Sequence, residues 1–579
     1  MPENEMSPAR SWWKDAVVYQ IYPRSFADSD GDGIGDLPGI TARLDYLAEL
    51  GVDVLWLSPV YPSPHDDNGY DISDYQDVDP LFGSLEDFDK LLAAVHDRGM
   101  KLIMDLVVNH TSDEHPWFAA SRRDGPGGPQ RDWYWWRPAR PGMEPGTPGA
   151  EPNNWESWFS GPAWTYDEGS GEYYLHTFSR KQPDLNWENP KVRQAVYRMM
   201  RWWLERGADG FRMDVINLIS KDPALPDGQV PQGSTFGDGR PHYVCGPRIH
   251  EFMAEMHREV FADYAGRLLT VGEMPGVTVE QARKFTDPAR RELDMVFQFE
   301  HVGLDHGPGG KFDPRPLKLT DLKASLGRWQ TGLARTGWNS LYWNNHDQPR
   351  VVSRYGDDSP EHRARSVTLL ATVLHLHHGT PYVYQGEELG MANAPFTTLD
   401  DYRDIESLNH FIDRTRRGAD PDDVLAALRA RSRDNARTPM QWDASEHAGF
   451  TTGTPWIAVN PDHTRINAET QLAEPDSVFH YYRRLIALRK TEPAIVDGVF
   501  HMLLPHDETI YAFTRHHRST GTELLVLANW AGKVTPLTVP EGWAGTEVIL
   551  ANVPDAGPLA HRHTLHPWEA RVHRRTRRH

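Results

Sequence analysis

The sequence is nearly free of cysteine, since Cys245 is the single one among its 579 residues. One thiol cannot form a disulfide within the chain, so stabilisation by internal crosslinks is excluded. A lone thiol with no other nucleophile signature is more often inert than catalytic. A chain of this length buries a large core without crosslinks, and the length predicts two or three domains.

Long apolar runs and an excess of positive charge are also missing. No run reaches the ~18–20 apolar residues of a membrane span, and the polar, acidic N-terminal residues lack the pattern of a signal peptide. We therefore expect no membrane partner and a cytoplasmic location. Acidic residues outnumber basic ones by 82 to 61, which gives a formal net charge of −21. Such a charge disfavours nucleic acid as a partner.

Apolar runs rich in β-forming residues alternate with amphipathic helical patterns over most of the chain. Eight strands are expected within residues 16–26, 52–60, 100–110, 208–217, 268–274, 295–301, 339–347 and 380–388. Strands separated by helices predict parallel βαβ units, and eight units are enough to close a (β/α)₈ TIM barrel. An open, doubly wound α/β sheet is the alternative.

Two segments interrupt this alternation. Residues 110–180 are rich in Trp, Pro, Gly and Asn and follow the third strand, which indicates a loop-rich inserted subdomain. From residue 498 onward short strand patterns predict a C-terminal antiparallel β-sandwich. The expected domains are therefore the barrel in two parts, 1–109 and 181–497, the insert at 110–180, and the β-sandwich at 498–579.

Polar side chains stand where the expected barrel strands end, which is where barrel enzymes place functional groups. The residues at the ends of strands three, four, five and seven are Asp105, Asn109 and His110; Arg212 and Asp214; Glu273; and Asn345, His346 and Asp347. Arg212 and Asp214 are two residues apart and so share one face of their strand. The arginine can then hold the aspartate ionised. A single strand-end carboxylate is often a cap or a turn residue, but three together predict a catalytic basin.

Paired carboxylates are what glycoside hydrolysis requires. In a retaining enzyme they stand ~5–5.5 Å apart, and one attacks the anomeric carbon while the other transfers the proton. Asp214 beside Arg212 suits the ionised nucleophile. Glu273, after the apolar run LLTVG, suits an acid whose pKa is raised by an apolar setting. Tyr70 offers an aromatic face to a sugar, and Asp67 can accept bonds from its hydroxyls.

A second acidic cluster lies in ADSDGDGIGDL, near the start of the chain. Asp28, Asp30, Asp32 and Asp36 alternate with small residues, a pattern that can enclose a hard cation such as Ca²⁺ in oxygen ligands. Twelve residues into the loop stands Gly39, where an EF-hand needs Glu, so this is a calcium loop of another kind. An Asp/Gly-rich turn without metal is the alternative reading.

The motifs taken together resemble the α-amylase superfamily of glycoside hydrolases, in its oligo-1,6-glucosidase branch. The matching segments, in chain order, are WWKDAVVYQIYPRSF, DLVVNH, QPDLN, GFRMDVIN, VGEMPGVT, NNHDQPR, YVYQGEELGM and RDNARTPMQWD. The resemblance runs from Trp12 to the end of the barrel and, less distinctly, into the tail. It implies a small oligosaccharide substrate, a monomer or weak homo-oligomer, no organic cofactor and a structural Ca²⁺.

The resemblance also implies residue roles. Asp214 corresponds to the nucleophile, Glu273 to the acid/base and Asp347 to a third carboxylate that binds sugar hydroxyls. The glucose at the cleaved end would be held by Asp67, Tyr70, His110, Arg212, His346 and Arg433, with Arg437 at the pocket mouth. The implied calcium ligands are Asp28, Asp30, Asp32, the carbonyl of Ile34, and Asp36.

Linkage preference rests on the residue after the nucleophile. Val215 there resembles enzymes that accept α-1,6 bonds, whereas Ala or Thr resembles those restricted to α-1,4 bonds. A broader α-1,4-glucosidase or a sucrose-acting or transglucosylating enzyme remains an alternative. A sucrose isomerase is disfavoured because the Arg/Asp-rich loop of those enzymes is missing after strand six. A trehalose-6-phosphate hydrolase and a non-catalytic carbohydrate-binding homologue are further alternatives.

Overall fold

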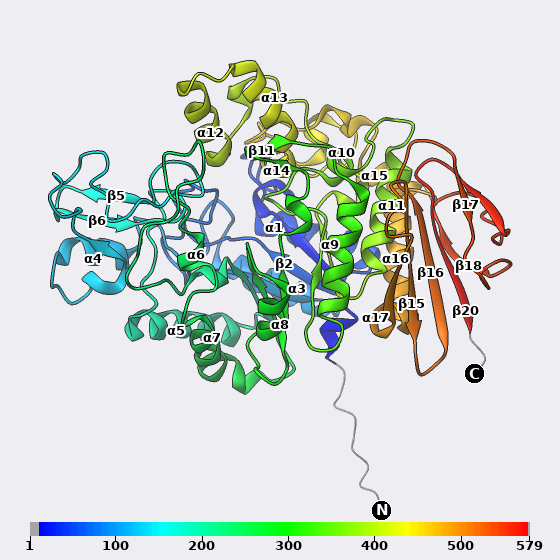
Figure 1. Cartoon of the computed structure of the whole chain (residues 1–579), viewed down its shortest axis with the longest axis horizontal. Helices are drawn as coiled ribbons and strands as arrows, with labels where there is room; N and C mark the ends of the chain where they lie inside the picture. Colours follow the sequence, from blue (N-terminus) through cyan, green and yellow to red (C-terminus); the bar gives the residue numbers. More distant parts are fainter. Residues whose placement is uncertain (1–10, 577–579) are drawn as a thin grey trace, which may run out of the picture.

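A computed structural model describes residues 11–576, and its centre is a closed parallel barrel (Figure 1). The strand order is β12-β13-β1-β2-β3-β7-β8-β9, and an isolated parallel bridge between Val296 and Asn339 joins the two ends. The strands are β1 (Val18–Ile21), β2 (Val54–Leu57), β3 (Lys101–Val107), β7 (Gly210–Asp214), β8 (Leu269–Glu273), β9 (Met295–Phe297), β12 (Ser340–Leu341) and β13 (Thr380–Tyr384). Each lies in a predicted segment, so the barrel is confirmed and the open sheet was the wrong alternative.

Helices surround the barrel, and their ends follow local sequence signals. The α3 helix (Leu85–Asp97) begins with a reciprocal capping box between Ser84 and Asp87. The α5 helix (Pro190–Arg206) begins with Pro190 and ends at Gly207, which adopts a left-handed conformation. The other helices around the barrel are α1 (Leu37–Ala42), α2 (Leu44–Leu50), α7 (Ile249–Met256), α8 (Val279–Thr286), α9 (Leu319–Gly332), α10 (Val351–Tyr355), α11 (Arg363–His375) and α16 (Val478–Thr491).

A part of the segment between β3 and β7, which precedes α5, projects from the barrel at the left of Figure 1. It contains α4 (Pro116–Asp124) and an antiparallel sheet in the order β4-β6-β5, formed by β4 (Trp136–Arg137), β5 (Trp164–Asp167) and β6 (Glu172–Leu175). These elements lie inside the predicted insert, whose boundaries at 110 and 180 stay predictions. The loop after β7 joins the same subdomain, because Leu225 and Tyr243 pack in one cluster with Trp155 and Trp164. Sequence patterns did not indicate that contribution.

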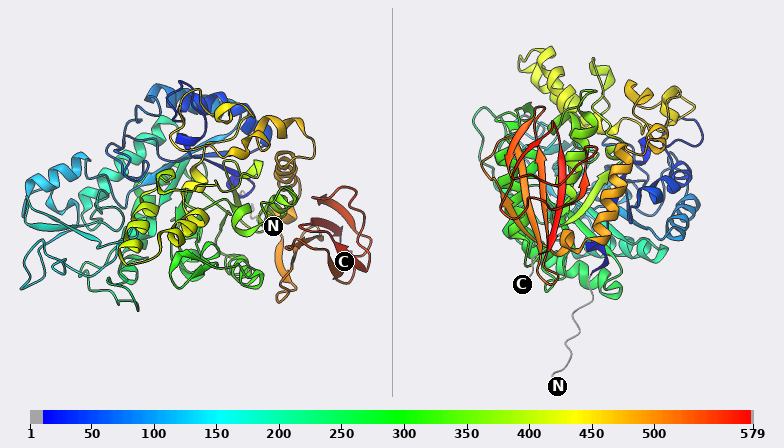
Figure 2. Two further views of the ribbon diagram at one scale, coloured as in Figure 1. Left: turned by 90° about the horizontal axis from the view of Figure 1, so that it is seen from above. Right: turned by 90° about the vertical axis from the view of Figure 1, so that its right-hand side faces the viewer.

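The C-terminal strands form two antiparallel sheets, and the larger one faces the barrel (Figure 2). The larger sheet has the order β14 (Val499–Leu503), β15 (Ile510–His517), β16 (Thr522–Asn529), β20 (Ala570–Thr576) and β18 (Glu547–Ala551); β17 (Thr535–Thr538) pairs with β19 (Arg562–Leu565). Alternate residues of β15 face opposite ways: Tyr511 and Phe513 join the main core, whereas Ile510 and Ala512 pack with Leu537 of the smaller sheet. Burial on both faces explains why the first four residues of this strand, IYAF, are all apolar.

A group of short elements lies together near one end of the barrel, at the top of Figure 1. It comprises the hairpin β10 (His306–Gly307) and β11 (Gly310–Pro314), and the helices α12 (Ile405–Arg416), α13 (Pro421–Arg431) and α14 (Asp434–Arg437). Three further short helices lie elsewhere: α6 (Arg240–Tyr243) in the loop after β7, α15 (Ala468–Ala473) and α17 (Pro493–Asp497). Within residues 11–576, no helix is both long enough and apolar enough to cross a membrane.

Candidate active site

Arg212 of β7 is the centre of the site. Its guanidinium is completely buried and contacts three carboxylates, each from a different part of the barrel wall. The N–O distances are 2.9 Å to Asp105 of β3, 2.6 Å to Asp214 at the end of β7, and 2.7 Å to Glu273 at the end of β8. One cation therefore holds three acids, two of which were predicted from the sequence as the catalytic pair.

The two carboxyl groups of that pair differ in their affinity for a proton. Burial raises the pKa of Glu273 to about 8, against the opposing effect of Arg212. Burial also raises the pKa of Asp214, to about 6, and again Arg212 opposes the rise. Near neutral pH the favoured state is thus an ionised Asp214 beside a protonated Glu273. That is the division of roles that a nucleophile and a general acid require.

Val215, directly after Asp214, has a backbone conformation that β-branched residues rarely adopt. Its φ is 34° and its ψ is 39°, in the left-handed region, where strain costs about 1–3 kcal/mol. In this conformation its N–H donates to Oε2 of Glu273 at 3.1 Å. The side chain is buried in the cluster that contains Trp155 and Trp164 of the insert. Packing against the insert thereby holds a strained turn that positions Glu273.

Asp347 lies in a second group of charges, beside two arginines and a histidine. Its Oδ1 is 3.1 Å from Arg433 and 3.0 Å from Arg437, and its Oδ2 is 3.4 Å from the His346 ring. Burial alone would raise the pKa of Asp347, but its neighbours His346, Arg433 and Arg437 hold it well below its ordinary value. Arg437 is itself completely buried and also donates to the His346 carbonyl. It therefore lies beneath the site, which corrects the expectation that it stands at the pocket mouth.

The remaining predicted sugar contacts line the space between these two groups. Arg433 binds Asp67 at 2.9 Å, although the two residues are 366 positions apart. Tyr70 donates to Asp105 at 3.0 Å and stacks on His346, with ring centroids 5.0 Å apart. Burial lowers the pKa of His110 to about 4 and that of His346 to about 3, so both imidazoles are neutral near pH 7. Neutral imidazoles can donate or accept a hydrogen bond from a sugar hydroxyl.

The acidic loop near the N-terminus brings three carboxylates together. Among residues 11–576, one oxygen each from Asp28, Asp30 and Asp36 lie within 4.8 Å of one another. Oxygens that share a Ca²⁺ at 2.3–2.6 Å lie within about 5 Å of each other, so this set fits the ion. Asp32 and Ile34, the other predicted ligands, are not part of that set. The side chain of Asp36 also caps α1 by accepting from the Gly39 N–H, which ties the loop to the helix.

Comparison with known proteins places this arrangement in a family. A model of the α-amylase catalytic domain matches residues 20–498. The chain belongs to the α-amylase family. It is 57% identical to an oligo-1,6-glucosidase of Parageobacillus thermoglucosidasius over 98% of this chain and 99% of that protein. It is 49% identical to a trehalose-6-phosphate hydrolase of Bacillus subtilis, with 98% of each chain covered.

Solved structures of the family superpose over nearly the whole chain. The trehalose-6-phosphate hydrolase of Bacillus licheniformis aligns with a TM-score of 0.90 at 46% identity, over 98% of this chain and 100% of that one. The trehalulose synthase MutB of Pseudomonas mesoacidophila aligns with a TM-score of 0.92 at 42% identity, with the same coverage. The α-amylase fold is therefore shared by enzymes with different names, and the fold alone does not select among them.

Several residues of the site were not assigned from the sequence. The sequence places Asp105 at a strand end without indicating its role. Gln182, which donates to Asp67 at 3.1 Å, belongs to the QPDLN motif, which does not indicate this contact. No sequence pattern indicates Asp404. It is fully buried, accepts a hydrogen bond from Nε of Arg433 at 2.8 Å and caps α12. Asp is a common residue at helix N-termini, so the position of Asp404 in the sequence does not indicate a functional site.

Lys221 anchors the loop after β7 of this α-amylase family member to Asn109 and Asp184, which flank the insert. It is fully buried, and its ammonium lies 2.9 Å from Asp184 and donates at 2.9 Å to both Asn109 and the Leu218 carbonyl. Asp184 in turn accepts from the N–H of Thr177 at 2.8 Å. Such a pair is costly to break, because removal of one partner leaves the other charge buried and unpaired.

Replacement of Lys221 by Met is expected to destabilise the protein by roughly 3–5 kcal/mol. Thermal unfolding, followed by circular dichroism, measures the effect as a fall of several degrees in Tm. Lys181→Met is the matched control, since Lys181 pairs with Asp113 at 3.1 Å in a solvent-accessible setting. That control should cost about 1 kcal/mol or less. Equal losses in the two variants would contradict the anchoring role of Lys221.

Proposed function

We propose that this chain is a retaining, exo-acting α-glucosidase that releases terminal glucose from α-1,6-linked isomalto-oligosaccharides. The observation that carries the proposal is the arrangement around Arg212, where one guanidinium binds both Asp214 and Glu273 and keeps their carboxyl groups close. A retaining mechanism needs its two carboxyl groups about 5–5.5 Å apart. Relatives named oligo-1,6-glucosidase, 54–57% identical over 97–98% of this chain, support the α-1,6 linkage.

The reaction follows from the two protonation states. The Asp214 carboxylate attacks the anomeric carbon as the bond to the leaving oxygen breaks, and Glu273 protonates that oxygen. A glucosyl ester of Asp214 remains. Glu273, now ionised, removes a proton from water, whose oxygen attacks the anomeric carbon and displaces Asp214. Glucose leaves with its α-configuration retained, and both carboxyl groups return to their starting states.

The charged residues around Arg433 account for cleavage at the end of the sugar chain. The Arg433–Asp67 pair and Asp347 form one side of the pocket, and Asp404 fixes the arginine from below. In this proposal Asp67 and Asp347 accept hydrogen bonds from the hydroxyls of the terminal glucose. A buried ion pair at that position leaves no path for a further sugar unit, so the chain end is the part that binds.

The function is tested by initial glucose release from isomaltose, maltose, sucrose and trehalose 6-phosphate, measured side by side. Isomaltose is expected to be cleaved fastest, and Asp214→Asn should lose activity on all four while keeping its folded circular dichroism spectrum. Val215→Ala should shift the isomaltose-to-maltose ratio toward maltose by about tenfold, because a pocket contact of this size is worth about 1–3 kcal/mol. Faster release from trehalose 6-phosphate or sucrose would contradict the α-1,6 assignment, and a fully active Asp214→Asn would contradict the nucleophile.

The pH dependence of kcat/KM should be bell-shaped. Asp214 must be ionised, so activity falls as the pH drops through its pKa of about 6; Glu273 must be protonated, so activity falls as the pH rises through its pKa of about 8. The profile is read with isomaltose between pH 4 and 10. Glu273→Gln, assayed with an aryl glucoside whose leaving group needs no proton, should lack the alkaline limb. An alkaline limb that persists in that variant would exclude Glu273 as its source.

We also propose that the Asp28–Asp36 loop binds a structural Ca²⁺ through Asp28, Asp30 and Asp36, with Asp32 and the Ile34 carbonyl as further ligands. An ion that binds only the folded state raises stability by ~2.7 kcal/mol at a hundredfold excess over its Kd. Addition of Ca²⁺ to chelator-treated protein should therefore raise Tm by several degrees. Asp30→Ala should lose that increase, whereas Asp45→Ala, an exposed acid on α2, should keep it. An equal Ca²⁺ response in both variants would contradict the site.

A further inference from the structure

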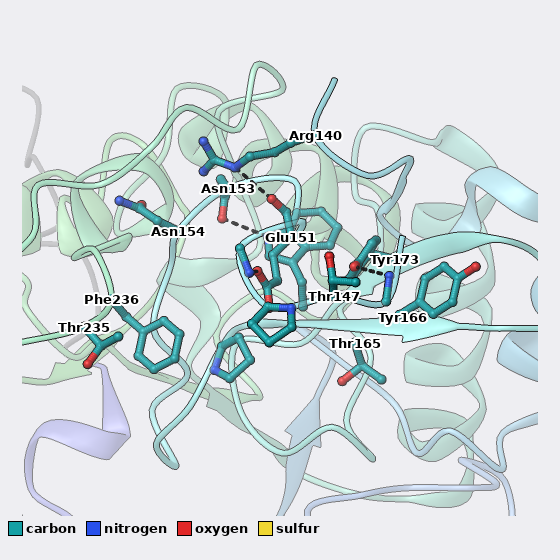
Figure 3. Close-up of a pocket in the computed structure, with 15 residues that line it drawn as sticks. Arg140, Thr147, Glu151, Asn153, Asn154, Thr165, Tyr166, Tyr173, Thr235 and Phe236 are labelled. Carbon is teal, nitrogen blue, oxygen red and sulfur yellow. Dashed lines mark hydrogen bonds between the residues drawn. The ribbon is translucent and has the colours of Figure 1, made fainter. Parts of the chain in front are cut away.

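A cavity of about 740 Å³ lies in the inserted subdomain (Figure 3). Residues 140–154, strands β5 and β6 and the loop after β7 form its walls. Its size is within the ~300–1,000 Å³ of small-molecule sites. Arg212, Asp214, Glu273 and Asp347 are not among its lining residues, so it is a separate space.

Aromatic rings stand on two sides of this cavity. Figure 3 shows Phe236 on one side and Tyr166 with Tyr173 on the other. Tyr166 is half-buried and held by Tyr173, with ring centroids 5.1 Å apart. Phe236 is also half-buried, yet within residues 11–576 it stacks on no other ring and belongs to no cluster of the hydrophobic core. A half-buried ring that lines a cavity and stacks on no other ring is available to a ligand.

The charged groups at the cavity exclude an anionic ligand. The Arg140 guanidinium is already paired with Asp227, to which its Nη1 donates at 3.0 Å, and its Nε donates to the Glu151 carbonyl at 2.9 Å. Glu151 accepts the Gly149 N–H at 2.8 Å through Oε2, and no other described residue donates to its Oε1. The charged groups at this cavity therefore offer more free hydrogen-bond acceptors than donors. Such a surface suits a neutral ligand that carries many hydroxyl donors.

We infer that this cavity is a second carbohydrate site, which binds a neutral glucose oligosaccharide between Phe236 and Tyr166 while Glu151 accepts from its hydroxyls. Aromatic faces that pack on the apolar faces of sugar rings, combined with carboxylate acceptors on the edges, are the groups that recognise such a molecule. The choice of glucose units rests on the proposed function. The proposed function does not use the cavity itself.

The second site is linked physically to the catalytic one. Trp164 lines the cavity and packs in the same cluster as Val215, whose N–H binds Glu273. Asn153 and Asn154 of the cavity wall donate to the Leu225 and Gly228 carbonyls of the loop after β7. A bound oligosaccharide would thus rest on the loop that follows the nucleophile strand and stay close to the active site.

The experiment counts bound isomaltotriose per chain by equilibrium dialysis, with Asp214→Asn to prevent turnover. We expect two sites, and the added change Phe236→Ala should remove one of them by weakening it about tenfold or more. The matched control is Val230→Ala, an exposed apolar residue of the same loop that does not line the cavity. It should keep both sites. Sorbitol as the dialysed ligand controls for nonspecific binding of hydroxyl groups.

The outcomes separate this inference from the proposed function. A single site that Phe236→Ala leaves unchanged overturns the inference while the proposed function stands. Two sites that both survive Phe236→Ala also overturn it, because the second site then lies elsewhere. A single site that Phe236→Ala removes supports the cavity and contradicts the proposed function, since the catalytic pocket would then bind no glucose oligosaccharide. A crystal of Asp214→Asn soaked in isomaltotriose locates the sugar directly.

Discussion

The sharing of one buried guanidinium among three carboxylates is the constraint on which the site depends. Arg212 can neutralise one unit of charge, yet Asp105, Asp214 and Glu273 all contact it. In a buried setting, three ionised acids around a single cation are unfavourable, so the group as a whole retains a proton. Glu273, whose pKa is raised furthest of the catalytic pair, is where that proton resides. The acid of the reaction is thus produced by the burial of Glu273, with the neighbouring carboxylates Asp214 and Asp347 adding to the rise in its pKa.

A different balance governs the other half of the site, where two arginines are present instead of one. Around Asp347, the guanidinium groups of Arg433 and Arg437 supply positive charge, and the pKa of this aspartate is held low. Asp347 stays ionised across the pH range in which Asp214 and Glu273 exchange protons. Two neighbouring groups of charges, one with a single arginine and one with two, therefore keep Asp214 and Asp347 ionised beside a protonated Glu273. The barrel makes this possible because its strand ends meet at one rim.

The inserted subdomain contributes more than a wall to the pocket. Its tryptophans and the loop after β7 share a cluster with Val215, and that cluster holds a strained backbone turn beside the nucleophile. The buried Lys221–Asp184 pair also ties the loop after β7 to the segment that follows the insert. Strain at a single residue persists only when the surroundings overdetermine it. The insert therefore acts on the chemistry through packing, and a change in its core reaches Glu273 through one backbone N–H.

The sequence alone determined the barrel, the strand ends and the main carboxylates, because these follow from periodic patterns. The spacing of two in GFRMD places Arg212 and Asp214 on one face, and parallel strands bring their ends to one rim. The tertiary structure decided the rest: the Asp67–Arg433 pair across 366 residues, the role of Asp404, the burial of Arg437 and the turn at Val215. These contacts join irregular loops, which have no period from which a partner can be read, so only the packing of the whole chain selects them.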